Sequence, residues 1–91
     1  MAARATWKPY PALGEIKEED LPDSAFAFPR QRKEPLIDVH HLTQALLHFP
    51  QVDGVSDADR EVAFANIKKA ARYYGIGIPD KDWHDLIDRG A

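Results

Sequence analysis

The chain has 91 residues, a formal net charge of −3 and no cysteine. This length fits a single domain, and the lack of cysteine excludes disulfides, zinc–thiolate sites and thiol nucleophiles. A mildly acidic chain is not typical of a protein that binds nucleic acid without sequence preference. The N-terminus lacks the apolar stretch of a signal peptide, and no apolar run is long enough to cross a bilayer. We therefore expect a cytoplasmic protein with no membrane partner.

Residues 1–19 are predicted to form an extended, partly mobile arm. The run Trp7-Lys8-Pro9-Tyr10-Pro11 favours polyproline-like backbone, because proline fixes its own φ and biases the preceding residue toward extended geometry. An exposed aromatic side chain between prolines is typical of a protein-docking segment. Trp7 and Tyr10 are therefore candidate partner-binding residues.

Residues 20–91 are predicted to form one helical domain that begins with a short helical turn near residues 21–27. Asp20 can cap this turn, and Pro22 fits its first position, where a backbone N–H is not needed. Pro29 ends it. We expect the segment from Leu21 to Phe28 to wrap around the helical core, because a disordered segment would waste its apolar side chains.

Three main helices are predicted, over about residues 38–49, 56–74 and 79–88. Asp38 is a good N-cap for the first helix, whose expected core face is Val39, Leu42, Leu46 and Phe49. The second has a capping box at Ser56 and Asp59 and a C-terminal Gly75, and its expected buried stripe is Ala63, Ile67, Ala70, Ala71 and Tyr74, flanked by Phe64. Trp83, Leu86 and Ile87 share one side of the third. The predicted fold class is therefore all-α.

The phrase Leu21-Pro22-Asp23-Ser24-Ala25-Phe26-Ala27 resembles a family of uncharacterised small bacterial and phage domains. Further matching segments, among them Gln51–Arg60 and Asp82-Trp83-His84, extend this resemblance over about residues 20–88. It implies one compact module, found alone or attached to larger proteins. It implies no activity and supplies no catalytic residues.

The residues that could carry chemistry have simpler explanations. His41 and His48 share a helix face but lie two turns apart, about 10 Å by helical rise, which is too far for one metal ion. Asp80, His84 and Asp88 offer only pairs of ligands. Ser24 is best explained by turn chemistry and Ser56 by capping. We therefore expect no enzyme activity, no metal and no cofactor.

Two short basic groups remain as candidate binding residues. Arg30, Arg32 and Lys33 precede Pro35, and three further cations lie on the second helix: Lys68, Lys69 and Arg72. The first group could contact a protein partner. Both groups together could contact phosphates, although a solvated loop and helix-dipole compensation are the simpler explanation.

The sequence thus predicts a non-enzymatic interaction module for an unidentified protein partner, an accessory component of a larger bacterial or phage assembly. Its binding residues would be Trp7, Tyr10, Arg30, Arg32 and Lys33. The alternative is a small nucleic-acid-binding domain that uses residues 30–33 and 68–72. Self-association is left open.

Overall fold

The computed structural model describes residues 4–10, 18–79 and 82–90. Its main elements are the strands β1 (Phe26–Phe28) and β2 (Lys33–Pro35) and the helices α1 (Val39–His48), α2 (Asp57–Tyr74) and α3 (Trp83–Gly90). Three single 3-10 turns complete the list: η1 (Glu18–Asp20), η2 (Asp23–Ala25) and η3 (Phe49–Gln51).

The capping residues predicted for α1 and α2 are confirmed. Asp38 Oδ1 accepts a hydrogen bond of 2.7 Å from the backbone N–H of His41. Ser56 and Asp59 form both bonds of a capping box, at 3.1 and 3.0 Å. Gly75 ends α2 with a φ of 75°, a left-handed conformation that glycine adopts without a Cβ clash.

Two helical predictions need correction. The third helix begins at Trp83 rather than near residue 79, because the carboxylate of Asp82 accepts the His84 amide at 2.8 Å and so starts the helix there. The sequence predicts Val39 in the core, yet the residue is 46 % exposed. Leu42 and Ala45 are the fully buried positions of α1.

The all-α prediction is wrong, because β1 and β2 pair as an antiparallel two-stranded sheet. Phe26 lies opposite Pro35, and Phe28 lies opposite Lys33. The helical turn expected near 21–27 shrinks to the single turn η2, and β1 follows it directly. All three residues of β1 are buried, so the strand lacks the alternation of apolar and polar residues that reveals half-buried strands.

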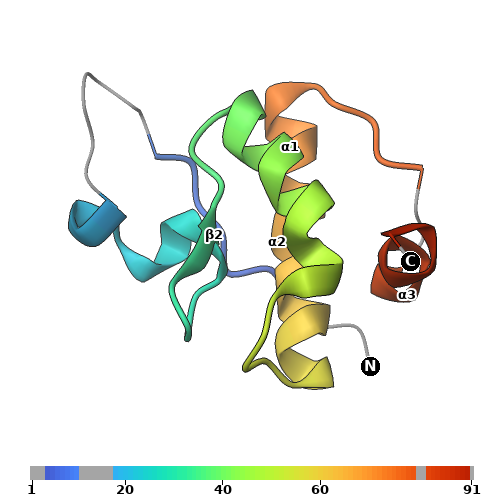
Figure 1. Cartoon of the computed structure of the whole chain (residues 1–91). Helices are drawn as coiled ribbons and strands as arrows, with labels where there is room; N and C mark the ends of the chain where they lie inside the picture. The colour runs from blue at the N-terminus through green and yellow to red at the C-terminus, as the bar shows by residue number, and fades with distance from the viewer. Residues whose placement is uncertain (1–3, 11–17, 80–81, 91) are drawn as a thin grey trace.

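The elements form layers around the helix pair α1 and α2 (Figure 1). The small sheet lies on one side of this pair, with β1 against α2 and β2 against α1. Helix α3 lies on the opposite side, where it contacts η3 and α2. This arrangement leaves β2 beside the C-terminal end of α1.

The N-terminal arm contributes a central core side chain. Trp7 is fully buried, and its indole Nε1 donates to the Leu36 carbonyl at 3.1 Å. Its ring also makes edge contacts with Tyr73 and Tyr74. Residues 4–10 are therefore packed on the body of the domain; the predicted arm otherwise falls mostly outside the described residues.

Candidate interaction surface

The loop between the two strands is attached to the first turn of α2. Gln31 Nε2 donates to Asp59 Oδ2 at 2.9 Å, and Arg30 Nη1 lies 3.9 Å from Asp59 Oδ1. The hydrogen bond from the Ser56 backbone N–H is the main cause that lowers the pKa of Asp59 below its usual value. The carboxylate is therefore charged at neutral pH. The Arg30 side chain is 83 % exposed and available to a partner.

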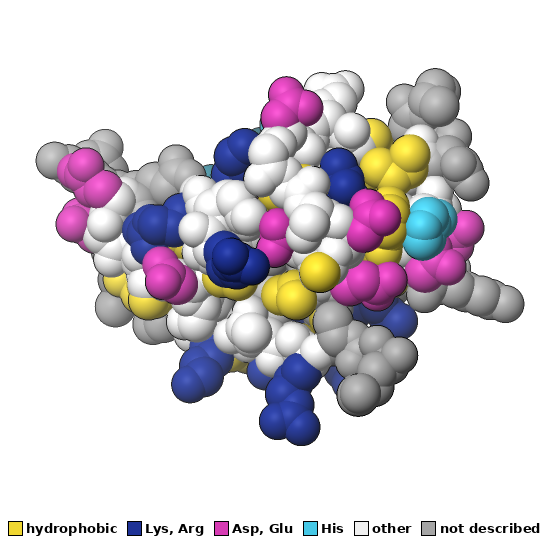
Figure 2. Space-filling view, turned by 90° about the horizontal axis from the view of Figure 1, so that it is seen from below, with side chains coloured by type: hydrophobic (Ala, Val, Ile, Leu, Met, Phe, Trp, Pro, Cys, Tyr) yellow, Lys and Arg dark blue, Asp and Glu magenta, His cyan; other side chains and the backbone are white. Residues whose placement is uncertain are grey.

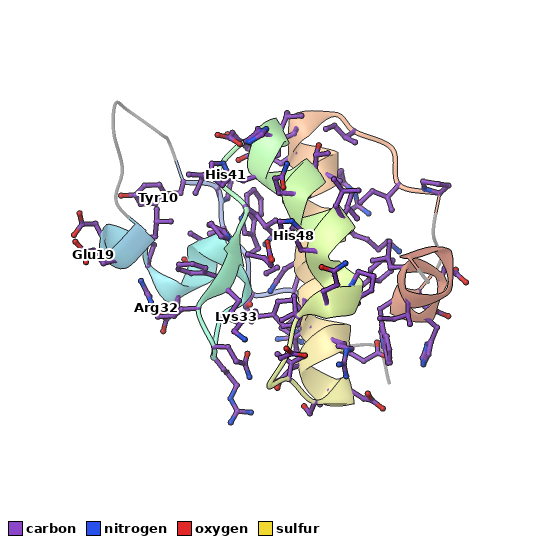
Figure 3. All side chains as sticks on the ribbon, in the orientation of Figure 1. Tyr10, Glu19, Arg32, Lys33, His41 and His48 are labelled. Carbon is purple, nitrogen blue, oxygen red and sulfur yellow. The ribbon has the colours of Figure 1, made fainter. Side chains whose placement is uncertain are left out.

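Arg32 and Lys33 each have a partner within the chain. Arg32 forms an ion pair with Asp23, donates to the Leu21 carbonyl at 2.7 Å and lies over the ring of Phe26. Lys33 Nζ donates to the Asp53 carbonyl at 2.6 Å. These contacts hold Arg32 against the segment before β1 and Lys33 against the segment after α1, and Figure 3 labels the two residues on opposite sides of the hairpin.

A groove of about 560 Å³ opens beside β2. Its walls include residues 32–35 of the hairpin and, from the end of α1 and the segment after it, His48, Gln51, Val52 and Asp53. Its size falls within the range of ligand-binding pockets in proteins. The structure therefore brings the predicted residues Arg32 and Lys33 into one hollow with side chains that were not predicted.

Glu34 and His48 join the two walls of this groove. His48 Nδ1 lies 3.5 Å from Glu34 Oε1, and Figure 3 places His48 on the flank of α1 that faces β2. Glu34 lies within a strand yet has a φ of 58°, in the left-handed region that costs a residue with a side chain about 1–2 kcal/mol. Such strain persists only where the surrounding contacts enforce it, and it often marks a functional site.

The second basic group lies elsewhere. Lys68, Lys69 and Arg72 are exposed on the C-terminal half of α2, whereas loop 30–33 is fixed to Asp59 in its first turn. Asp59 and Lys68 are nine positions apart, which is roughly 13 Å along the helix. The structure therefore does not merge the two groups into one basic surface. On the face in Figure 2, acidic and basic side chains are interspersed rather than segregated.

The two predicted docking aromatics are not presented to solvent as expected. Trp7 is fully buried, and Tyr10 is half-buried against a small cluster of Leu21, Ala25 and Phe26. The sequence pattern could not distinguish an aromatic side chain that docks on a partner from one that docks on its own domain. The hairpin groove is the better candidate surface.

His41, His84 and Ser24 each make local contacts away from the groove. His41 contacts Asp38 and His84 contacts Asp82, in each case beside the start of a helix. Across the described ranges, no group of three His, Cys, Asp or Glu side chains could hold a metal ion. The Ser24 carbonyl accepts the Lys8 amide at 3.0 Å, which ties the arm to η2.

A sequence model described as "Family of unknown function (DUF6582)" matches residues 10–81. No curated protein and no solved structure matches the chain. In the part of the chain that the structure describes, the helices are too short or too polar to cross a membrane.

Proposed function

Because the chain belongs to this family of unknown function, we propose from its own surface that it is a non-enzymatic interaction module. It binds a polar segment of a partner protein in the groove between β2 and the end of α1. Its setting in a bacterial or phage assembly rests only on the resemblance of the sequence phrase.

One observation supports this proposal most directly. The backbone of the groove wall is strained at Glu34, and its side chains are held by contacts across the groove. Glu34 is held at a positive φ, its carboxylate lies near His48, and Lys33 is anchored to the Asp53 carbonyl. Side chains fixed in this way lose little freedom on binding, so more of the contact energy becomes affinity. Charges of both signs line the groove, which suits a partner segment that itself carries both donors and acceptors.

The proposal of a non-enzymatic role is supported by where the polar side chains lie. Two of the histidine–carboxylate contacts lie beside helix starts, and Ser56 and Asp59 are used as caps. The remaining contact, between His48 and Glu34, has no hydroxyl nucleophile among the described residues that line the groove.

Nucleic-acid binding receives less support. Loop 30–33 is fixed to Asp59 in the first turn of α2, whereas Lys68, Lys69 and Arg72 are exposed on its C-terminal half, so the two basic groups do not form one phosphate-binding surface. Phosphate contacts also make binding fall steeply with added salt. That salt dependence separates the two functions.

The test is affinity capture with the full chain as bait, followed by mass spectrometry. The groove variant combines His48→Ala and Gln51→Ala, two exposed positions whose truncation leaves the core intact. Lys69→Ala, which is exposed away from the groove, is the matched control.

The proposal expects a protein that is retained by the wild type and the control, lost from the groove variant, and captured after nuclease treatment. Equal capture by all three baits, or no specific capture, would contradict the groove. Capture that needs nucleic acid and disappears in the triple variant Arg30→Ala, Arg32→Ala, Lys33→Ala would favour the alternative.

A further inference from the structure

A second, smaller hollow lies between α2 and the segment that leads away from it. Its volume is about 230 Å³, and it is lined by Lys68, Ala71, Arg72, Ile76 and Ile78. Ile76 is held there by a backbone hydrogen bond of 2.8 Å to the Ala71 carbonyl, which is part of the turn that ends α2. The lining of the hollow therefore combines three apolar side chains, Ala71, Ile76 and Ile78, with two cations.

These two cations differ from three arginines elsewhere in the chain. Arg30, Arg32 and Arg60 each have an acidic partner, whereas no acidic side chain of the described residues pairs with Lys68 or Arg72. Lys68 Nζ instead lies 5.6 Å from the centre of the Phe64 ring. The whole chain has a net charge of −3. Lys68 and Arg72 are neighbouring cations with no acidic partner among the described residues, so they form a locally positive site.

Lys68 and Arg72 are four residues apart on one helix, so their side chains lie on the same flank of α2. An arginine guanidinium can bind both oxygens of a carboxylate, and a lysine adds a point charge beside it. The apolar side chains of the lining, Ala71, Ile76 and Ile78, can contact a small aliphatic group next to that carboxylate. A peptide C-terminus with an aliphatic last residue carries both groups on one carbon atom.

We propose that this hollow, the α2 end pocket, binds the C-terminal carboxylate and aliphatic side chain of a partner polypeptide. An internal Asp or Glu brings a carboxylate with only one or two methylenes beside it, and a phosphate brings charge alone. The proposal is independent of the hairpin groove, since the two sites share no residue.

The test is a titration of the ¹⁵N-labelled full chain followed by NMR. N-acetyl-leucine is the probe, N-acetyl-leucinamide removes its charge, and inorganic phosphate removes its aliphatic group. For a ligand of this size we expect roughly millimolar affinity and shifts confined to the amides of residues 68–78. The amide and phosphate probes should each bind about tenfold more weakly or not at all.

Three variants complete the experiment. Arg72→Ala and Lys68→Ala should each weaken N-acetyl-leucine binding several-fold, whereas Lys69→Ala, an exposed neighbour outside the pocket, should not. If N-acetyl-leucinamide bound as tightly as N-acetyl-leucine, the site would recognise only the aliphatic group. If phosphate bound as tightly, the site would recognise any anion. Either result, or shifts that Arg72→Ala leaves unchanged, would overturn the proposal.

Discussion

Asn66 of α2 holds Trp7 in the core through its side-chain amide, whose Oδ1 accepts the Trp7 backbone N–H at 2.8 Å. The same oxygen accepts the Thr6 N–H at 2.7 Å, and Asn66 Nδ2 donates to the Ala27 carbonyl at 2.9 Å. Asn66 is fully buried. One amide therefore joins the arm, the sheet and the central helix, and it satisfies backbone groups that no strand pairs with.

Replacing this amide should destabilise the fold strongly. In Asn66→Ala, the buried N–H of Trp7 and carbonyl of Ala27 both lose a partner, and each such loss costs about 1–3 kcal/mol. We expect the free energy of unfolding, measured by urea denaturation, to fall by about 3 kcal/mol. The exposed control Lys69→Ala should change it by less than about 0.5 kcal/mol. A loss below about 1 kcal/mol would mean that water replaces the amide.

Truncation of Trp7 tests whether the arm is part of the core. Trp7→Ala removes a fully buried indole, a change that costs about 3–5 kcal/mol in typical cores. Domains of this size have only about 5–15 kcal/mol of stability, so thermal unfolding should begin at much lower temperature. Lys8→Ala, next to it and exposed, should melt as the wild type does. Trp7→Phe, which loses the Leu36 hydrogen bond but keeps an aromatic ring, should lie between them.

Asp59 predicts a dependence of stability on pH. The hydrogen bond from the Ser56 amide is the main cause that lowers its pKa below the usual 3.8, and the Ser56 side chain, Gln31 and Arg30 add smaller contributions. A group with a lowered folded-state pKa stabilises the fold above its unfolded pKa, and this contribution is lost as the pH falls through the folded value. The melting temperature of the wild type should therefore exceed that of Asp59→Asn at neutral pH. The gap should shrink below about pH 4, and a constant gap would contradict this origin.

Two substitutions of Glu34 should separate the effect of its backbone strain on stability from the effect of its carboxylate on binding. Glu34→Gly relieves the positive φ but loses the carboxylate, whereas Glu34→Gln keeps the strained backbone and loses only the charge. We expect the glycine variant to be about 1 kcal/mol more stable than the glutamine variant in thermal melts. Both should bind the partner of the hairpin groove less well than the wild type. If glutamine proved the more stable of the two, the backbone at residue 34 would not be strained.

The helices could be predicted because their signals are local. Asp38, Ser56 and Gly75 lie at or beside the ends of the helices they cap, so their roles can be read from the sequence. The strands could not, because β1 has three buried residues and β2 ends in a proline. The groove could not be predicted for a related reason. Glu34 and His48 meet only after the hairpin has packed on α1, and neither residue belongs to a recognisable motif.

The buried arm also shows why the role of Asn66 was missed. Asn66 and Trp7 are 59 positions apart, and a polar residue among the alanines of a helix looks like a solvent-facing position. Trp7 itself stands out in the sequence, but the prolines near it favour an exposed docking segment. The structure shows instead that Trp7 packs on α2 of the same chain.

The position of Trp7 bears on how much of the chain is needed to fold. The family match begins at residue 10 and ends at residue 81, so it leaves out both tryptophans. Both are buried, Trp7 completely and Trp83 with 7 % exposed. A fragment trimmed to the matched stretch would have a hole on each side of α2. The shortest fragment with a complete hydrophobic core therefore begins before Trp7 and ends after Leu86.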